Sequence, residues 1–503
     1  MKNENENKND NDKILIGITV TKSDNFSEWY RQMIVKAEMI DYGEISGCYI
    51  LRPNAYSLWE KIQDYVDFRI KKMGVKNAYF PLFGTKNNLE KEQSHLEGFT
   101  AEVAWVTKAG SSDLAEPIFV RPTSETLMYG HFANWIKSHR DLPLKINQWC
   151  NVVRWEFKDC TPFIRSREFL WQEAHTCFKT REEADKEVQI VLEMYANVYR
   201  KLLAVPVIMG KKSVREKFAG ADYTTTVECF VPAIGKAIQG ATSHCLGQNF
   251  SKMFDIKIEI NDYTKQYVYQ NSWGITTRTI GVMAMVHGDD QGLVLPPAIA
   301  PIQVIIIPCG IGNKTTHSDA ENIENTCKEM VDILALANIV AQIDDRDQYR
   351  VGYKFNYWEL RGVPLRIEIG PNDIKKSTVI VCRRDTKEKQ TISYANGFPQ
   401  QIQSILDTIQ QSMYNKAEKE LNQSICTCHN NEELMCAIKN KCMGLAPWCE
   451  IESCEDSIVA ICKNNGLSVK SLCIPFDNII TENSKCFSCG LSAKSFTLFG
   501  SSY

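Results

Sequence analysis

The sequence predicts a mixed α+β protein, with an antiparallel sheet followed by a compact α/β domain and a small cysteine-rich module. At 153–177, hydrophobic and polar residues alternate on both sides of a turn containing Pro162, which is typical of a β-hairpin. Between Ala300 and Pro399, apolar strands alternate with amphipathic helices, as in an α/β domain. Ten of the 19 cysteines follow Leu421, which defines the third region.

Length and composition place the chain among ordinary globular proteins. Its 503 residues have room for two to four domains, and 44% hydrophobic and 24% charged residues are typical of such proteins. No apolar run reaches the roughly 18 residues of a transmembrane helix, so no membrane span is expected. The net charge of −3 offers no global attraction for nucleic acid, so such a partner would need local basic patches.

The N-terminal residues and the cysteine count indicate the compartment. Residues 1–20 are rich in Asn, Glu, Lys and Asp, so we expect a disordered tail rather than a signal peptide or a membrane anchor. An odd cysteine total without a secretion signal favours a reducing compartment, where clustered cysteines bind metal more often than they form disulfides. The expected location is therefore the cytoplasm.

The other elements follow from hydrophobic periodicity and from the positions of Gly and Pro. Before the hairpin, the predicted elements are helices at 24–41, 53–73 and 127–139, with strands at 75–81 and 117–120. After it come a helix at 181–203, a series of antiparallel strands and a helix beginning at Gly274. The α/β domain should contain strands at 302–308, 339–344, 363–370 and 378–384 and helices at 318–337 and 352–360, with a helical connector at 400–420. Segment 95–110 is expected to be a loop or an edge near a site.

Charged side chains gather in the predicted hairpin. They are Arg154, Glu156, Arg165, Arg167, Glu168, Glu173 and His175. A salt-bridged sheet surface is the ordinary explanation for such a mixture, although surface pairs contribute little stability. Arginines with fixed donor forks, placed among carboxylates and large aromatic residues, favour a polyanionic ligand instead.

The segment RPTSET at 121–126 has two equally good interpretations. Ser124 or Thr123 suits the N-cap of the helix that follows. Alternatively, Thr123 and Glu125 present a hydroxyl and a carboxylate to a small cationic group.

Motif by motif, the chain resembles the class II aminoacyl-tRNA synthetases. The helix and strand ending at Pro81 match motif 1 of that class, RWE with RSREFLWQEAH matches motif 2, and SWGITTRTIGVMAMVHGDDQGLVLPP matches motif 3. The segments RPTSET, KFAGA and GATSHCLGQNF are typical of the prolyl-tRNA synthetase family of archaeal and eukaryotic type. Two departures stand out: GITTR differs from the Gly-x-Gly-x-Glu-Arg form of motif 3 in many class II enzymes, and Ala174 replaces the usual Gly. A methyl group at Ala174 would either narrow the pocket or only shift the strand.

The resemblance implies an antiparallel class II catalytic core at 21–297, an α/β anticodon-binding domain at 298–400, and a connector helix with a small α/β zinc-binding domain at 401–503. It implies activation of L-proline by ATP to prolyl-adenylate, with release of pyrophosphate, and transfer of prolyl to tRNA(Pro). The enzyme would be a cytoplasmic homodimer formed through motif 1. Bacterial relatives insert an editing domain between motifs 2 and 3, and the sequence between His175 and Gln239 has no room for one.

The resemblance also assigns the ligand-binding residues. ATP would be held by Arg154, Glu156, Arg165, Gln239, Thr242 and Arg278, with Mg²⁺ bridging its phosphates, and Arg154, Glu156, Arg165 and Arg278 would be catalytic. The proline pocket would consist of Thr123, Glu125, Arg154, Trp171, Glu173, His175, Phe218, His244 and Ser272. Halofuginone-type inhibitors would occupy the same pocket, with Phe99, Glu102 and His175 at its rim. A lone histidine such as His244 is more often a core residue, but within GATSHC it is a site residue.

In the anticodon-binding domain, the resemblance places Phe355, Glu359 and Arg366 near the tRNA bases. An aromatic ring for stacking, a carboxylate and a guanidinium suit unstacked bases. Basic residues would then contact phosphates. They are Lys375, Lys376, Arg383, Arg384 and Lys387.

The cysteine-rich module predicts a structural zinc site. Cys449 and Cys454 form C-x4-C, while Cys486 and Cys489 form C-x2-C, a spacing typical of tetrahedral Zn²⁺. A competing set contains Cys426, Cys428 and His429. The resemblance favours the first set, because APWCE, AKS and the TLFG ending match the family. In this family type the carboxylate of Tyr503 folds back toward the catalytic domain.

Three other functions compete with this interpretation. A threonyl-type synthetase would need Cys and His ligands for a catalytic zinc near the hairpin, and no such spacing occurs there. A non-catalytic, synthetase-like protein would not need Arg154, Glu156, Arg165 and Arg278. A zinc-stabilised RNA-binding protein explains only the last two domains.

Overall fold

The computed structural model describes residues 17–87, 89, 103–155, 159–261, 264–312, 315–477, 480–481 and 483–503. The chain divides into two compact units. The larger contains Tyr42–Ile50, Trp59–Val286 and Tyr414–Tyr503, and the smaller contains the described parts of Met1–Asp41, Leu51–Leu58 and His287–Met413. No helix in the described ranges is long and apolar enough to cross a membrane.

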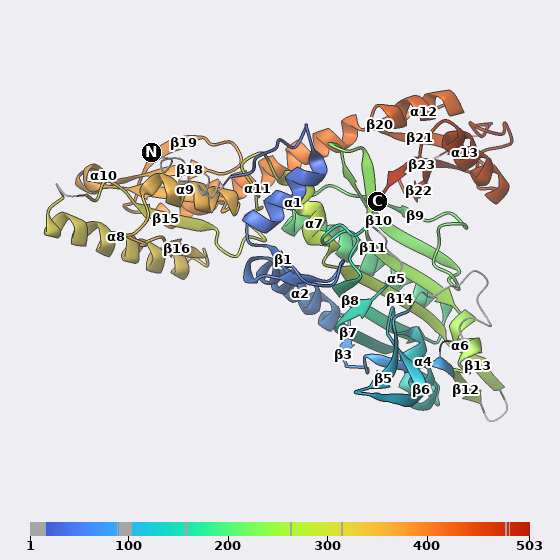
Figure 1. The fold of residues 1–503 in the computed structure, drawn as a ribbon. Helices are drawn as coiled ribbons and strands as arrows, with labels where there is room; N and C mark the ends of the chain where they lie inside the picture. The colour runs from blue at the N-terminus through green and yellow to red at the C-terminus, as the bar shows by residue number, and fades with distance from the viewer. Residues whose placement is uncertain are drawn as a thin grey trace, which may run out of the picture. The chain divides into compact units, whose positions relative to one another are not determined.

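The larger unit is built on one 11-stranded sheet (Figure 1). Its order is β20 (Ile425–Thr427), β21 (Met443–Trp448), β23 (Ser495–Ser502), β22 (Lys470–Pro475), β9 (Ile208–Lys211), β10 (Tyr223–Val231), β11 (Lys236–Gly247), β14 (Tyr269–Thr276), β8 (Glu168–Phe178), β7 (Leu144–Val153) and β3 (Lys76–Asn77). The pairings from β9 to β7 are antiparallel, as predicted for the catalytic core.

The predicted hairpin is present, but its first strand is shifted. β7 ends at Val153, which pairs with Glu168 of β8. Arg154 therefore lies at the start of the connecting loop, whereas the alternation over 153–157 had predicted a strand there. The second strand is confirmed and extends to Phe178.

The larger unit also contains helices α4 (Glu125–Trp135), α5 (Arg181–Asn197) and α6 (Asn249–Met253), and α7 (Arg278–His287) up to Val286. A capping box between Thr180 and Glu183 begins α5, which packs on β8, β10, β11 and β14 and continues into a π-helical turn, η2 (Val198–Leu202). The helix predicted to begin at Gly274 was misplaced: Gly274 lies inside β14, opposite Glu173, and α7 begins four residues later. Residues 176–238 fold into β8, α5, η2, β9, β10 and the start of β11, so this stretch contains no separate domain.

The residues after α11 (Phe398–Gln423), which we call the C-terminal module, extend the 11-stranded sheet beyond β9; strands β9, β10, β11, β14, β8 and β7 are called the catalytic sheet below. β22 pairs with β9 through Ile474 and Lys211, and β23 runs parallel to the start of β11 through Ser501 and Lys236. Helices α12 (Asn431–Lys439) and α13 (Glu452–Asn464) complete the module. In Figure 1, β22 and β23 lie beside β9, so this module and the catalytic strands share one sheet.

The smaller unit contains the predicted α/β domain. Its five strands lie in the order β16 (Ala341–Ile343), β15 (Val304–Pro308), β17 (Leu365–Ile369), β18 (Thr378–Arg383) and β19 (Lys389–Ser393). The helices of this domain include α8 (His317–Leu336), α9 (Val351–Leu360) and α10 (Pro371–Lys376). Helix α1 (Phe26–Lys36) also belongs to the smaller unit. The sequence had not indicated α10 and β19, because both are short and their exposed residues are mainly polar.

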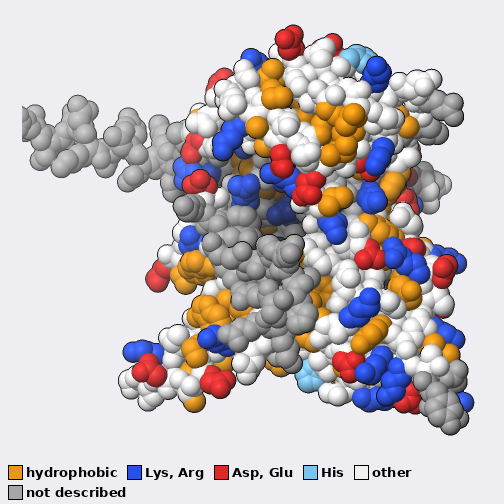
Figure 2. All heavy atoms as spheres, turned by 90° about the vertical axis from the view of Figure 1, so that its right-hand side faces the viewer, with side chains coloured by type: hydrophobic (Ala, Val, Ile, Leu, Met, Phe, Trp, Pro, Cys, Tyr) orange, Lys and Arg blue, Asp and Glu red, His pale blue; other side chains and the backbone are white. Residues whose placement is uncertain are grey.

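The remaining elements are α2 (Pro53–Lys72), α11 (Phe398–Gln423), the short 3₁₀ helix η1 (His139–Asp141) and four small pairings of strands. The strands are β1 (Ile40–Tyr42), β2 (Tyr49–Leu51), β4 (Phe83–Thr85), β5 (Trp105–Ala109), β6 (Ser112–Val120), β12 (Lys257–Asn261) and β13 (Thr264–Tyr267). On the face drawn in Figure 2, basic and acidic side chains are interspersed.

Candidate active site

A cavity of about 430 Å³ lies on the catalytic sheet of the larger unit. Most of the predicted ligand-binding residues line it: Thr123, Glu125, Arg154, Trp171, Glu173, His175, Phe218, Gln239, Thr242, His244, Ser272 and Arg278. Arg165 does not line the cavity, although its neighbours Ile164 and Ser166 do. Glu156, Phe99 and Glu102 lie outside the described residues.

Strand periodicity explains why these side chains converge. Trp171, Glu173 and His175 alternate along β8 and share one face. Across the sheet His175 lies opposite Ser272, which in turn lies opposite His244. Three neighbouring strands thus present their side chains to one cavity.

The same periodicity decides the question raised by Ala174. This residue is fully buried and pairs with Trp273 and Asn147. Because it alternates with Glu173 and His175, its methyl group points to the opposite face of the sheet. Ala174 therefore does not narrow the cavity.

Glu173 is the centre of a buried hydrogen-bond network. Its side chain accepts hydrogen bonds from Ser124 Oγ and from Gln148 Nε2 at 3.1 Å, and its Oε2 lies 3.2 Å from His175 Nε2. Burial alone would raise the pKa of Glu173, but the hydrogen bonds and the charge of His175 lower it below its usual value. The carboxylate is therefore held in its charged form.

His175 is the complementary partner in this network. Burial would lower its pKa, but the hydrogen bond to Glu173 and the charges of Glu125 and Glu173 raise it above its usual value. When it is protonated, His175 can donate from both ring nitrogens, to Glu173 and to Tyr129 Oη, which lies 2.8 Å from Nδ1.

The pKa of His244 is shifted in the opposite direction from that of His175. Burial, together with the positive charges of His175 and Arg154, lowers the pKa of His244 to about 3. Its Nδ1 lies 2.9 Å from Thr224 Oγ1, and its ring centroid lies 4.8 Å from that of Phe218. The two neighbouring imidazoles thus have pKa values that are shifted in opposite directions.

We expect His244 to remain neutral down to about pH 4 in the folded protein. Its folded pKa lies below the value of about 6.5 in an unfolded chain, so the unfolded state binds more protons between these two values. The contribution of His244 to the free energy of unfolding therefore falls as pH falls through this window. Nitrogen-15 NMR of the imidazole at pH 5 checks this, and a midpoint near 6 would contradict it.

The other side of the cavity is cationic. Arg154 Nε donates to Pro122 O at 3.1 Å, and its guanidinium lies 5.4 Å from the Trp171 ring centroid. Arg278 donates to Ile164 O and Gln239 O, each at 3.1 Å. Burial and the nearby Arg154 and Arg165 lower the pKa of Arg278, which indicates a concentration of positive charge suited to an anion.

The structure distinguishes the two interpretations of RPTSET. Ser124 occupies the N-cap of α4, but its side chain makes no capping hydrogen bond and donates to Glu173 instead. Thr123 Oγ1 donates to the carboxylate of Glu125. Thr123 and Glu125 line the cavity, so the segment contributes a hydroxyl and a carboxylate to it.

Several cavity residues were missed from the sequence. Phe163 and Phe169 line the cavity, and Phe163 has a positive φ of 64°. Phe169 was detectable because it alternates with Trp171. Gln148 and Tyr129 support Glu173 and His175 from β7 and α4, and no local sequence signal distinguishes them from core residues.

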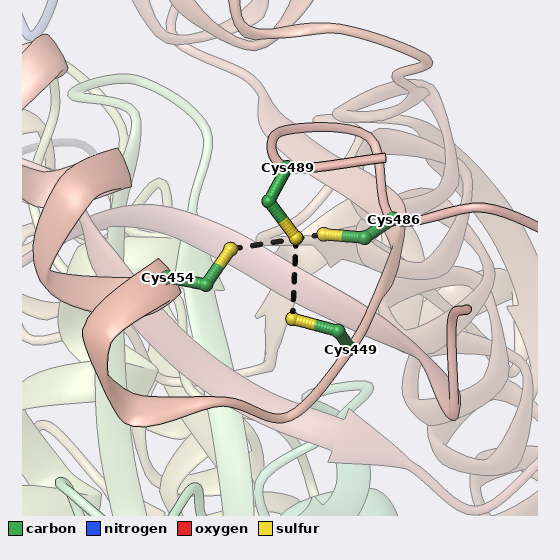
Figure 3. A group of neighbouring side chains, drawn as sticks. All are labelled: Cys449, Cys454, Cys486 and Cys489. Atoms are coloured by element: carbon green, nitrogen blue, oxygen red, sulfur yellow. Dashed lines mark hydrogen bonds between the residues drawn. The ribbon is translucent and has the colours of Figure 1, made fainter. Parts of the chain in front are cut away.

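The four cysteines of the favoured set converge in the C-terminal module (Figure 3). The sulfur atoms of Cys449, Cys454, Cys486 and Cys489 all lie within 4.8 Å of one another, with Cys454–Cys486 at 3.7 Å and Cys449–Cys489 at 3.6 Å. A tetrahedral zinc with bonds of about 2.3 Å separates its sulfurs by about 3.8 Å. The residues therefore fit a metal ion. Within the described ranges, the competing set of Cys426, Cys428 and His429 forms no such cluster.

The smaller unit has a basic cavity of about 200 Å³ on the α/β domain. Glu359 and Arg366 line it, and the Phe355 ring centroid lies 4.0 Å from the Arg366 guanidinium. Arg383, Lys387 and Lys389 are the other basic residues around it, together with Arg384. Lys375 and Lys376 lie on α10 and do not line this cavity.

Arg384 does not match its predicted role in phosphate contact. The side chain is 3% exposed and donates to both carboxylate oxygens of Asp289, at 2.6 and 2.7 Å. Its Nε donates to Glu359 O at 2.8 Å. This guanidinium is therefore occupied by protein acceptors rather than directed at solvent.

Comparisons with known proteins agree on the family. Residues 105–287 match the family model "tRNA synthetase class II core domain (G, H, P, S and T)", residues 303–402 match "Anticodon binding domain", and residues 431–503 match "Prolyl-tRNA synthetase, C-terminal". These matches confirm the predicted fold class.

Individual relatives are similar along nearly the whole chain. A cytoplasmic proline--tRNA ligase of Arabidopsis thaliana is 50% identical, over 97% of this chain and 91% of the relative. A bifunctional glutamate/proline--tRNA ligase of Drosophila melanogaster is 52% identical over 97% of this chain, which spans 29% of that longer protein. The crystal structure of prolyl-tRNA synthetase from Cryptosporidium parvum, complexed with halofuginone and AMPPNP, has a TM-score of 0.93 and 52% identity over 97% of this chain and all of that one. This chain therefore belongs to the prolyl-tRNA synthetase family of the class II aminoacyl-tRNA synthetases.

Proposed function

We propose that the chain is a proline--tRNA ligase, which joins L-proline to the AMP moiety of ATP as prolyl-adenylate, releasing pyrophosphate, and then transfers prolyl to tRNA(Pro). The observation that supports this most directly is one cavity with two chemical sides. Arg154 and Arg278 form a cationic side, and Thr123, Glu125 and Glu173 form an acidic, hydrogen-bonding side. We expect the carboxylate of the bound proline to contact the α-phosphate of ATP at the boundary between these two sides.

The chemistry needs position and charge rather than a protein nucleophile. The carboxylate of proline attacks the α-phosphorus in line, and the bond to pyrophosphate breaks, so negative charge develops on phosphate oxygens. Arg154 neutralises the reacting carboxylate and α-phosphate, while Arg278 binds the leaving phosphates. Gln239 and Thr242 contact the nucleotide, and Glu156 and Arg165 are assigned to it by family resemblance. Mg²⁺ bound with ATP would supply further charge neutralisation.

The acidic side suits a small cyclic amino acid. Glu125, with Thr123, binds the secondary ammonium, and the aromatic walls of Trp171 and Phe218 pack on the ring. Glu173 and His175 order this part of the cavity through the network described above, and His244 and Ser272 complete it. The same cavity would accept halofuginone-type inhibitors; the structure of the Cryptosporidium relative is that of a complex with halofuginone.

The remaining assignments follow the family. Zn²⁺ bound by Cys449, Cys454, Cys486 and Cys489 would be structural, since four thiolates leave no open position. The basic cavity around Glu359 and Arg366, with Phe355, would bind the anticodon. We also propose a homodimer, a cytoplasmic location, and domain boundaries near residues 20, 297 and 400.

The direct test is ATP–pyrophosphate exchange with each of the twenty amino acids. We expect exchange with proline that greatly exceeds exchange with any other amino acid. Alanine and cysteine should give the strongest background, because each missing methylene is worth only about 1–3 kcal/mol of discrimination. Absence of proline-dependent exchange by folded protein would contradict the proposed function.

A further inference from the structure

One wall of the cavity is a loop between β9 and β10, at residues 212–222. Glu216 and Phe218 of this loop line the cavity. Phe218 N donates to Thr224 Oγ1 at 2.9 Å, and this hydroxyl lies 2.9 Å from His244 Nδ1. The position of the loop therefore determines the shape of the cavity around His244.

Ser213 organises this loop from within. Its Oγ accepts a hydrogen bond from Glu216 N at 3.3 Å, and its carbonyl accepts one from Lys217 N at 3.0 Å. A displacement of Ser213 would therefore move the backbone that carries Glu216 and Phe218.

The C-terminal module anchors Ser213 through a buried polar cluster. Glu455 Oε1 of α13 lies 3.3 Å from Ser213 Oγ and 2.6 Å from Ser471 Oγ of β22, and the two hydroxyls lie 3.0 Å apart. All three residues are at most 3% exposed. Glu455 Oε1 is the shared acceptor of this cluster, while its Oε2 has no hydrogen-bond partner among the described residues. Displacing Ser213 would leave further buried polar groups unpaired, so the cluster favours one position of Ser213.

Three further contacts join the same module to the same loop. Lys212 Nζ donates to Leu472 O at 2.7 Å, and Arg215 forms an ion pair with Asp456. Lys470 Nζ lies 3.1 Å from Glu216 Oε2, so the module touches a side chain that itself lines the cavity. These contacts join residues more than 240 positions apart in sequence.

We propose that the C-terminal module holds loop 212–222 in its binding conformation, and that Glu455, Asp456 and Lys470 are positioning residues for the proline side of the site. The proposal rests on the proposed function. When a contact is lost, the loop occupies its binding conformation for a smaller fraction of the time, and apparent proline affinity falls by that fraction. Once proline is bound the loop is ordered, so kcat at saturating proline stays nearly unchanged.

The main test uses Lys470→Met, which removes the ion pair to Glu216 at a side chain that is 41% exposed. We expect the KM for proline in the exchange reaction to rise about two- to five-fold, as for loss of one partly exposed pair, with kcat and the KM for ATP unchanged. Lys470→Arg should retain the pair and the wild-type KM. Lys463→Met, at an exposed lysine of α13, is the matched control and should have no effect.

A charge exchange tests the Arg215–Asp456 pair independently. Asp456→Arg should raise the KM for proline, and combining it with Arg215→Asp should restore it, which a merely structural effect of either substitution would not do. An unchanged KM in both Lys470→Met and Asp456→Arg, with wild-type protein active on proline, would overturn the positioning role alone. Wild-type protein without proline-dependent exchange would instead reject the proposed function.

Discussion

Replacing Arg154 by alanine is expected to lower the rate of prolyl-adenylate formation by about 10²–10³-fold, as for loss of one donor to a developing anion. Arg154 directly follows β7 and lines the cavity. It is positioned by a hydrogen bond to Pro122 O and by the rings of Phe169 and Trp171. Its positive charge stabilises the negative charge on the proline carboxylate and the α-phosphate most strongly in the transition state. Single-turnover adenylate formation and pyrophosphate exchange measure the loss.

The matched control is Arg167→Ala. Arg167 belongs to the same loop, contacts Ser46 O at 3.2 Å and the Trp155 ring, and does not line the cavity. The Arg167→Ala variant should keep a pyrophosphate exchange rate within a few-fold of wild type, and both variants should unfold near the wild-type temperature. Near wild-type exchange by Arg154→Ala would remove Arg154 from the proposed catalytic set.

If the four cysteines bind zinc as proposed, replacing Cys454 by serine is expected to remove the ion and to lower the free energy of unfolding of the C-terminal module by on the order of 5 kcal/mol. Serine lacks the thiolate that a tetrahedral zinc requires. Of the three remaining cysteines, Cys449 and Cys486 are buried and would lose the ion that they share. The measured zinc content should fall from about one ion per chain toward zero, and thermal unfolding should begin at a lower temperature.

Activity should fall in the same variant, because α13 carries both Cys454 and Glu455, and β22 continues the catalytic sheet beside β9. Cys436→Ser is the control: this exposed cysteine lies in α12 of the same module and outside the metal-binding set. It should keep zinc, stability and activity. Full zinc content in Cys454→Ser would contradict the four-cysteine assignment.

Local patterns determined much of this protein. The alternation of Phe169, Trp171, Glu173 and His175 identified a strand with one functional face, because side-chain direction in a strand depends only on position along it. The spacing of Cys449 with Cys454, and of Cys486 with Cys489, indicated two ligand pairs for one metal. The family motifs then identified the class II core and its prolyl type, which the comparisons confirm.

The tertiary structure decided features that depend on contacts between distant segments. Where β7 ends, and hence that Arg154 begins a loop, is determined by the pairing of Val153 with Glu168 rather than by periodicity. The burial of Arg384 follows from its ion pair with Asp289, some 95 residues earlier in the chain. A charge pattern in one segment contains no information about such a partner.

The sequence by itself therefore determined most of the candidate site residues, the strand face that carries them and the family, since these depend on local spacing and on motifs. Only the tertiary structure decided that Ala174 faces away from the cavity, that Ser124 supports Glu173 rather than capping α4, and that the C-terminal module continues the catalytic sheet. The physical reason is that long-range strand pairing and buried hydrogen bonds satisfy groups that lie far apart in the chain. Their partners become identifiable only when the folded chain brings them together.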